Sequence, residues 1–365
     1  MGRPIYSEAT LVNGSAGDPV LYVDYPDRNN ALLFDAGDVA KLPKEKIADL
    51  DAVFLTHHHA DHFMDLDRVI RANLDSDKTL NLFGPEGTIE RVYNRIRSYA
   101  HSYFPFQKLI LEVNDLLEDR IETSVLEYQR QFPEPTVTQR EFPSDHVVFE
   151  NDTVRVEAAP TDHTVPGFAY ALQEKSGFRF RFERLGKSSL RPGPWIAELI
   201  QAASRAGESL ETVSRRSNEN ISPGNMTPTQ SSQNVKTPDT TMEIDGGRFS
   251  VKELSERFLQ RGGGYRLGWI VDSRYGGTAD SGLERLAKKA DRLFCDCFYA
   301  EAQSKAAAKH KHMTTEDAAR LIRQARPKRV CLVHFSQRYQ GRYSKLVDEV
   351  RGQLTDVATE IDADL

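Results

Sequence analysis

Histidine and aspartate side chains are concentrated in one short segment of the chain. His57, His59, Asp61 and His62 follow the apolar run 52–55. If that run is a strand, the segment begins at the edge of a sheet, where side chains from a short turn can converge on one point. On extended backbone His57 and His59 point the same way. Imidazole and carboxylate ligands in this mixture suit zinc, with manganese or iron as substitutes.

Three more residues of ligand type each close an apolar run. His163 follows the strand-like run 154–158, Asp272 follows 267–271, and His334 follows 329–333. Ligands at strand ends are typical of an α/β scaffold whose functional site lies along one rim. We therefore expect these side chains to meet the histidine-rich segment.

The order of these residues resembles the metallo-β-lactamase superfamily and, within it, the ribonuclease Z family of endonucleases that remove the 3′ trailer from precursor tRNA. The superfamily resemblance rests on Asp35 in the sequence LFDAG and on the ligand-type residues above. The narrower resemblance rests on TDHTVPGFAY at 161–170, HFSQRY at 334–339, His312-Met313-Thr314, and the Gly-Pro motif at 192–194.

The resemblance implies an αββα sandwich with an inserted arm. Residues 1–174 and 263–365 would form the two stacked halves, and 175–262 the arm. It also implies two Zn²⁺ per subunit, with Mn²⁺ or Fe²⁺ as possible replacements. The chemistry of a two-metal site then assigns His57, His59 and His163 to the first ion, Asp61, His62 and His334 to the second, and Asp272 as the bridge.

The expected reaction is hydroxide attack on a phosphodiester, which leaves a 3′-hydroxyl and a 5′-phosphate. Asp61 would accept the proton of the attacking hydroxide. His312 would protonate the departing ribose oxygen, oriented by Asp296, because imidazole titrates near neutrality and needs a partner to fix its tautomer. Asp296 stands in Cys295-Asp296-Cys297, where the family often carries His-Glu-Ala-Thr, so the carboxylate is shorter here.

The proposed arm begins with a basic segment. Between 175 and 192, six basic residues stand against one acidic residue. Phe178, Phe180 and Phe182 alternate with arginines, which predicts a strand with its apolar face inward and its basic face outward. Solvated arginines on an amphipathic strand are the alternative, and the arm resemblance favours RNA. The substrate-binding residues predicted on this basis are Arg179, Arg181, Arg184, Lys187, Gly193 and Pro194.

Composition narrows the class of protein. Three cysteines argue against a disulfide framework, and no apolar run approaches the length of a membrane span, so we expect a cytoplasmic enzyme. Because the net charge is −6, RNA contacts must come from a local basic patch. The polar segment 205–241 is expected to be disordered. The resemblance implies precursor tRNA as partner and a homodimer.

Strands are expected at 20–23, 31–34, 52–55, 80–83, 268–271, 292–298 and 330–333, and helices at 65–74, 281–290, 315–326 and 341–354, with one starting near Met64. Two rival functions stay open. One is a phosphodiesterase or other hydrolase of the same fold that acts on a small molecule. The other is a relative without catalytic activity that binds metal or RNA.

Overall fold

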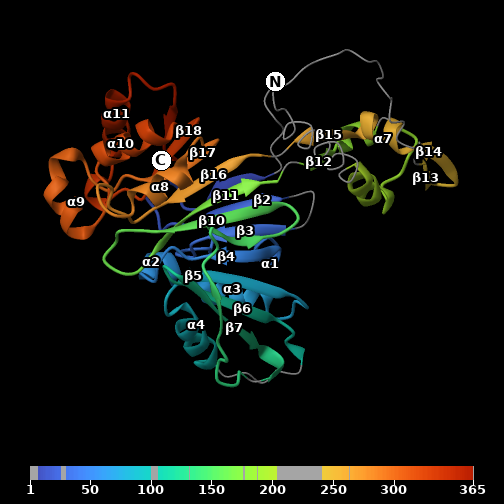
Figure 1. Ribbon diagram of the computed structural model, residues 1–365, viewed down its shortest axis with the longest axis horizontal. Coiled ribbons are helices and arrows are strands. Elements are labelled where there is room, and N and C mark those ends of the chain that lie inside the picture. The colour runs from blue at the N-terminus through green and yellow to red at the C-terminus, as the bar shows by residue number, and fades with distance from the viewer. Residues whose placement is uncertain are drawn as a thin grey trace, which may run out of the picture. The chain divides into compact units, whose positions relative to one another are not determined.

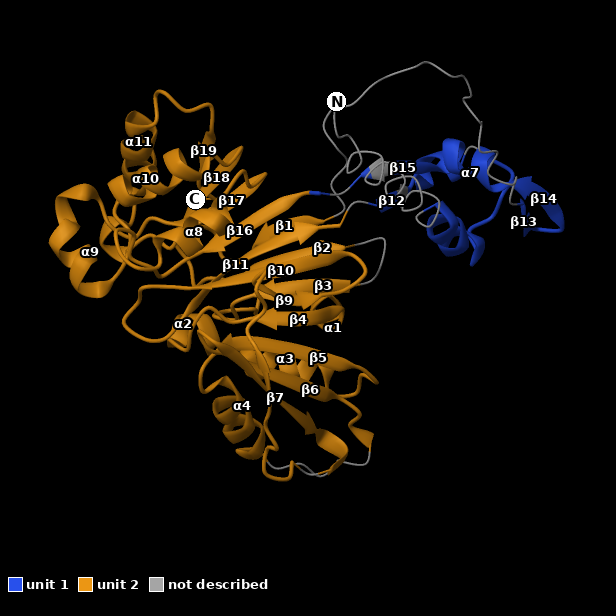
Figure 2. Ribbon diagram, in the orientation of Figure 1, with its two compact units in different colours: residues 1–6, 176–264 blue, residues 7–175, 265–365 orange. Residues whose placement is uncertain are grey.

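The protein divides into two compact units (Figure 2). The computed structural model describes residues 7–25, 30–99, 106–130, 132–175, 177–186, 188–203, 241–262 and 264–364. The larger unit comprises Ser7–Lys175 with Tyr265–Leu365, and the smaller unit contains Ser176–Gly264 together with Met1–Tyr6. These boundaries lie beside those that we expected at 174/175 and 262/263. The segment 205–240 and Lys187 fall outside the described residues.

The first sheet of the larger unit has eight strands that lie side by side in chain order. Strands β3 to β6 are parallel, and the outer pairs are antiparallel. The parallel strands therefore end at one rim of the sheet, where loops can hold functional side chains. The strands are β1 (Glu8–Leu11), β2 (Leu21–Tyr25), β3 (Asn30–Phe34), β4 (Leu50–Phe54), β5 (Thr79–Pro85), β6 (Ile110–Leu116), β7 (Arg120–Glu127) and β8 (Thr138–Glu141).

The second sheet has seven strands in the order β19-β18-β17-β16-β11-β10-β9. Its strands β16 to β19 are parallel, whereas β9, β10 and β11 pair antiparallel. The strands are β9 (Val147–Glu150), β10 (Val154–Pro160), β11 (Phe168–Glu174), β16 (Arg266–Ile270), β17 (Arg292–Asp296), β18 (Arg329–Val333) and β19 (Glu360–Asp362).

Helices cover the outer faces of both sheets (Figure 1). Amphipathic helices bury their apolar stripes in one core against the first sheet and in another against the second. The first group is α1 (Lys44–Ala48), α3 (Leu66–Asn73) and α4 (Thr88–Arg97), and the second is α8 (Asp280–Ala287), α10 (Thr315–Ala325) and α11 (Tyr343–Gln353). Within the described residues, no helix combines the length and apolar character needed to cross a membrane.

Aromatic side chains fill the space between the two sheets. Phe34 of β3 lies 6.1 Å from Tyr170 of β11, and Phe54 of β4 lies 5.7 Å from Phe149 of β9, measured between ring centroids. The Tyr170 hydroxyl donates a hydrogen bond of 2.8 Å to the Leu55 carbonyl, which joins the sheets beside the rim. The layers are therefore helix, sheet, sheet, helix, and the αββα sandwich predicted from the sequence is confirmed.

Removing this hydroxyl by Tyr170→Phe is expected to lower the free energy of unfolding by about 1–2 kcal/mol, because the buried Leu55 carbonyl loses its donor. Urea denaturation of both proteins measures the difference. Tyr343→Phe serves as the matched control, since that hydroxyl bonds to Gln337 at the exposed surface. Equal losses in the two variants would contradict the proposed joining role of Tyr170.

Most of the expected elements are present, but three details of the prediction are wrong. The helix after the histidine-rich segment, α2 (Ala60–Phe63), begins at Ala60 and not near Met64, so Asp61 and His62 are helical. Helix α8 ends at Ala287, three residues before the expected end. In the basic segment, strand β12 (Gly177–Phe180) ends at Phe180, and Phe182 begins α5 (Phe182–Leu185) with its side chain 49% exposed.

The smaller unit has its own apolar core. Stacked rings of Phe180 and Phe258 lie 5.6 Å apart, with Trp195 against both. Residues 195–203 are helical. The other elements are the pair β12 and β15 (Leu259–Gly262), the hairpin β13 (Thr241–Ile244) and β14 (Gly247–Ser250), and α7 (Val251–Phe258).

Candidate metal centre

Three polar residues that follow strands of the larger unit have left-handed backbone. The φ angles are 61° at Asp35, 51° at Asp272 and 62° at His334. These residues follow β3, β16 and β18, at the rim where the parallel strands end. Non-glycine residues rarely adopt this conformation, which costs about 1–3 kcal/mol and persists where the surrounding structure imposes it. The sharp turn aims each side chain back across the rim.

The loop after β3 holds α2 in place. The Ala36 amide donates to the His62 carbonyl at 2.8 Å, and the Asp65 amide donates to the Ala36 carbonyl at 2.9 Å. Gly37 lies so close to the Asp61 carbonyl that a Cβ at position 37 would collide with it. Asp61 and His62 are thus fixed by backbone contacts from a loop that is separated from them in sequence by α1 and β4.

Two groups of ligand-type atoms lie side by side in the larger unit. In the first, His57 Nε2 is 2.9 Å from His59 Nδ1, which is 3.4 Å from His163 Nε2. In the second, Asp61 Oδ2 is 3.7 Å from His62 Nε2 and 3.6 Å from His334 Nε2. The structure therefore brings together both trios that were predicted from the sequence.

The Asp272 carboxylate lies between the two groups. Its Oδ2 is 2.6 Å from His62 Nε2 and 4.0 Å from His57 Nε2, and its Oδ1 is 3.3 Å from His334 Nδ1. The side chain is 3% exposed. A single carboxylate in contact with histidines of both trios has the position that a bridging ligand requires.

Several buried polar atoms at this place make no well-aligned hydrogen bond, although some of them lie close to one another. They are His62 Nε2, Asp272 Oδ2, Asp296 Oδ1, His312 Nδ1 and His334 Nδ1. Buried polar atoms without partners are rare, because each costs free energy comparable to a lost hydrogen bond. Nitrogen and oxygen atoms turned toward one another fit divalent cations of the zinc type. The arrangement is therefore that of a metal centre.

Charges within the cluster shift the pKa values of its members strongly. Burial alone would lower the pKa of His62, but the Asp272 and Asp35 carboxylates outweigh it and raise that pKa to about 10. Burial also opposes ionisation of Asp272, yet the charges of His334 and His62 hold its pKa well below the usual value. The centre thus keeps its carboxylates negative and attracts positive charge, whether carried by protons or by metal ions.

Asp35 and Thr56 orient His57 and His62 by contacts with the Nδ1 atoms of the two rings. Asp35 Oδ2 accepts a hydrogen bond of 2.9 Å from Trp269 Nε1 and lies 3.1 Å from His62 Nδ1, while its Oδ1 accepts from the Thr56 amide at 2.7 Å. Thr56 Oγ1 is 3.1 Å from His57 Nδ1 and from His62 Nδ1. Contacts at Nδ1 fix the tautomer and leave Nε2 of both imidazoles for the cluster.

His312 and Asp296 lie next to the cluster, beside Asp272 and His334. His312 Nδ1 is 3.1 Å from Asp272 Oδ1 and 3.5 Å from Asp296 Oδ2, and the imidazole stacks on Phe298 at 4.1 Å. Asp296 is fully buried at the end of β17, and its Oδ1 lies 3.5 Å from His334 Nδ1. The two carboxylates outweigh the effect of burial and raise the pKa of His312 to about 9. His312 is thus held in position to carry a proton.

Asp162 joins the loops that carry three of these residues. Its Oδ1 is 2.8 Å from Lys311 Nζ, next to His312, and its carbonyl accepts from the Arg274 amide at 2.9 Å, two residues after Asp272. Lys311 Nζ also donates to the carbonyl of His163, which follows Asp162 in sequence. Asp162 thus connects the loops that carry His163, Asp272 and His312, through its carboxylate on one side and its backbone carbonyl on the other.

Comparisons with known proteins agree with this geometry. The model of the beta-lactamase superfamily domain matches residues 30–189. A ribonuclease Z from Deinococcus radiodurans is 24% identical over 343 residues, which cover 93% of this chain and 90% of the relative. The chain is a member of the metallo-β-lactamase superfamily, and its similarity to ribonuclease Z extends over nearly its whole length.

Solved structures of the metallo-β-lactamase fold show the same architecture. The short form of human tRNase Z aligns with a TM-score of 0.50 at 16% identity, over 91% of each chain. Unliganded yeast PDE1 aligns with a TM-score of 0.53 at 9% identity, over 98% of this chain and 97% of the other. At such identities the likeness concerns the fold. The metallo-β-lactamase fold and the similarity to ribonuclease Z together identify the chain as a metal-dependent hydrolase.

Two residues that contribute to this metal centre were not predicted as site residues. Asp35 was named only as part of a motif, and Thr56 was not predicted. Thr56 directly precedes His57 at the strand end, and that position was the available signal. His58, in the same segment, contacts Thr88 Oγ1 at 2.7 Å and joins neither trio.

The predicted RNA-binding residues belong to the smaller unit. Arg181 and Arg184 donate hydrogen bonds to backbone carbonyls at the end of α7, including that of Arg257. These arginines therefore terminate a helix within the unit, which is a structural role beside any contact with RNA. Gly193 and Pro194 precede the helix at 195–203, and the backbone of Arg179 lies in β12. Lys187 lies outside the described residues.

Proposed function

We propose that the protein is a zinc-dependent endoribonuclease that removes 3′ trailers from precursor tRNA and leaves a 3′-hydroxyl on the tRNA. The observation that supports this most is the meeting of two trios of ligand-type residues around Asp272, with His312 beside them. The ribonuclease Z relatives extend over nearly the whole chain, so the likeness includes the smaller unit as well as the metal centre.

His57, His59 and His163 are proposed to hold one zinc ion, Asp61, His62 and His334 a second, and Asp272 both. When bound, a pair of divalent ions supplies a water of lowered pKa and positive charge beside the scissile phosphate. Asp61 is the carboxylate best placed to accept the proton of that water, since its side chain is 44% exposed and lies beside His62 and His334.

His312 is proposed to protonate the departing 3′-oxygen of the tRNA. Asp296 accepts a hydrogen bond from the Met313 amide at 3.1 Å and lies beside His312, so it fixes the loop and the ring together. Proton donation by a positioned imidazole lowers the barrier for an alkoxide leaving group, which is a poor one when it departs unprotonated.

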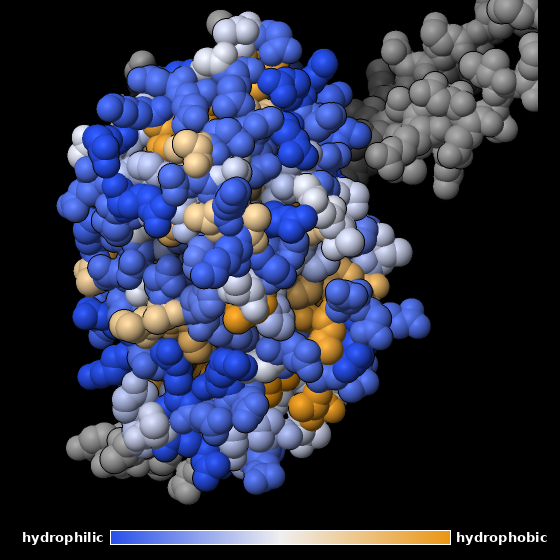
Figure 3. All heavy atoms as spheres, turned by 90° about the vertical axis from the view of Figure 1, so that its left-hand side faces the viewer, coloured by the Kyte–Doolittle hydropathy of each residue, from blue (hydrophilic) through white to orange (hydrophobic). Residues whose placement is uncertain are grey.

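The smaller unit is proposed to contact the tRNA outside the metal centre, through Arg179, Arg181, Arg184, Lys187, Gly193 and Pro194. The face of the larger unit that carries α9 (Ser304–His310) is mostly hydrophilic (Figure 3). A homodimer and a cytoplasmic location stay predictions.

Incubation of the zinc-loaded protein with a precursor tRNA that carries a 3′ trailer is expected to give one cut near the base of the acceptor stem. Mapping of the product ends locates the cut. His59→Ala and Asp61→Ala are expected to abolish it, because each removes a side chain from a different trio. His310→Ala is the matched control, since His310 is exposed on α9.

The rival function makes a different prediction in the same assay. If a small chromogenic phosphodiester is hydrolysed while the precursor stays whole, the enzyme is a phosphodiesterase of this fold that acts on small molecules. Loss of this hydrolysis in His59→Ala and Asp61→Ala, together with an unaffected His310→Ala protein, would still assign the chemistry to the metal centre.

A further inference from the structure

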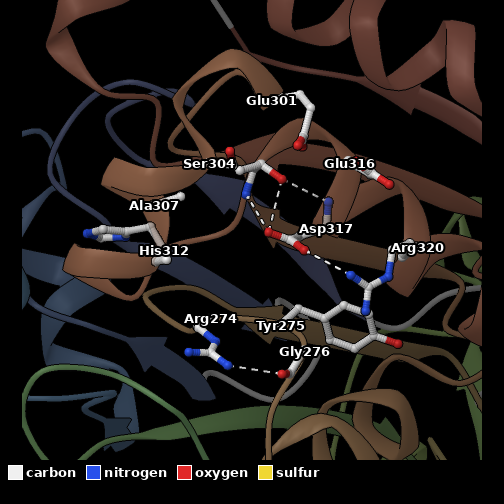
Figure 4. Close-up of a pocket in the computed structure, with 12 residues that line it drawn as sticks. Arg274, Tyr275, Gly276, Glu301, Ser304, Ala307, His312, Glu316, Asp317 and Arg320 are labelled. Carbon is white, nitrogen blue, oxygen red and sulfur yellow. Dashed lines mark hydrogen bonds and ion pairs between the residues drawn. The ribbon is translucent and has the colours of Figure 1, made fainter.

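A cavity of about 300 Å³ adjoins His312 in the larger unit. The loop after β16, the start of α9 and the first turns of α10 line it (Figure 4). His312 lies at one end, with its ring turned away from Asp317 and Arg320, while its Nδ1 faces Asp272 and Asp296. The cavity and the metal centre are therefore on opposite sides of this histidine.

Cationic and aromatic groups form one side of the cavity. The Arg320 guanidinium lies over the Tyr275 ring at 5.1 Å and donates to Asp317 Oδ1 at 3.3 Å. Arg274 donates one bond to the Gly276 carbonyl, and its side chain is 41% exposed. A guanidinium has five N–H donors, so both arginines keep donors for a phosphate or ribose.

Carboxylates form the opposite side. Figure 4 shows Glu301 and Glu316 along the upper edge of the cavity, across from Arg274 and Tyr275. Burial together with the neighbouring Glu316 and Asp317 raises the pKa of Glu301, which shows how closely these carboxylates are gathered. Asp317 is already used as a helix cap, because its Oδ2 accepts from the Thr314 amide and hydroxyl. Glu301 and Glu316 are the acceptors left for a ligand.

We propose that this cavity binds the nucleotide whose 3′-oxygen departs, and that it favours a base with an exocyclic amino group over uracil. The proposal rests on the proposed function, because it places the scissile phosphate at the metal centre and the departing oxygen at His312. The volume suits one nucleotide and excludes a helical stem. One cationic side suits the ribose phosphate, and one acidic side suits an amino group.

The preference for particular bases follows from hydrogen-bond chemistry. Adenine, cytosine and guanine each carry an amino group that can donate to a carboxylate. The N3–H donor of uracil lies between two carbonyl oxygens, which a carboxylate repels. Base discrimination by a good side-chain contact corresponds to about tenfold in affinity. Because the RNA is single-stranded at the cleavage site, the base edges of this nucleotide are free to be recognised.

Adenosine and uridine 5′-monophosphates test the cavity without requiring RNA cleavage. Each nucleotide competes with bis(p-nitrophenyl) phosphate for the zinc-loaded enzyme, and the ratio of their inhibition constants is measured. Adenosine monophosphate is expected to inhibit about tenfold more strongly. Glu301→Gln/Glu316→Gln is expected to remove this preference, because an amide offers uracil donors as well as acceptors. Glu45→Gln, exposed on α1 at the far end of the sheet, is expected to keep it.

Precursor tRNAs that differ only in the nucleotide before the cut give the second measurement. The adenosine form is expected to have a kcat/KM about tenfold above the uridine form, with the ratio near one in the double variant. Equal inhibition by the two monophosphates, or a preference that survives in the double variant, would overturn the proposal. If the precursor stays whole while the monophosphates are distinguished, the tRNA function fails and the nucleotide site stands.

Discussion

Asp272→Asn is expected to lower phosphodiester hydrolysis on the order of 10³-fold and to reduce the zinc content of the purified protein. Its carboxylate contacts histidines of both trios and is nearly inaccessible to solvent. Asparagine keeps the shape but removes the negative charge, which leaves the positive charge of ions and histidines uncompensated in a buried place. Metal analysis and a chromogenic phosphodiester assay measure both effects.

Asp348→Asn is the matched control for this substitution, because Asp348 is exposed on α11 and pairs with Arg351 at the surface. It is expected to keep full zinc content and activity, since surface ion pairs contribute little. Full zinc content and wild-type activity in Asp272→Asn would show that the carboxylate does not connect the two trios in the working enzyme.

The sequence could predict the members of the metal centre because their chemistry is local. Four histidines and an aspartate lie within six residues, a density of ligand-type side chains that is typical of metal sites, and His163 and His334 follow apolar runs that form strands. β10, β16 and β18 run in the same direction in the second sheet, so their ends meet at one rim. The αββα architecture was predicted from the family resemblance, which rests on the same ligand-type residues at the ends of these runs.

The start of α2 could not be predicted because its usual signals are missing. His59 occupies the N-cap position and its side chain makes no capping hydrogen bond. The helix is held instead by contacts of Ala36 with the residues of α2 and its end, which are remote in sequence. Where tertiary contacts replace a capping residue, local propensity places the helix end wrongly.

The end of β12 was missed for a similar reason. Alternating aromatic and basic residues predict a longer strand, but the pairing of β12 with β15 ends at Phe180 and Leu259. Beyond that pair the Arg181 amide donates to the Phe258 carbonyl, and the chain turns into α5. The left-handed backbone at Asp35, Asp272 and His334 also leaves no mark in the sequence, because it is imposed by the loops around the rim.

His312→Ala is expected to lower kcat for precursor tRNA by about 10²–10⁴-fold while zinc content stays unchanged. The imidazole is held between Asp272 and Asp296 and stacked on Phe298, so it is positioned without being a member of either proposed metal trio. A proton donor matters most when the leaving group is a ribose alkoxide. Hydrolysis of bis(p-nitrophenyl) phosphate, whose nitrophenolate departs without protonation, is therefore expected to fall much less.

The contrast between the two substrates distinguishes a proton donor from a metal ligand. If His312→Ala loses zinc and both activities fall equally, His312 binds metal together with His163 and Asp272, a grouping that the atom positions also permit. His310→Ala, two residues earlier and exposed, controls for disturbance of α9 and should leave both rates unchanged. A large loss of activity on precursor tRNA alone, the substrate with the poor leaving group, would identify His312 as the proton donor. A general weakening of the metal centre would lower both activities.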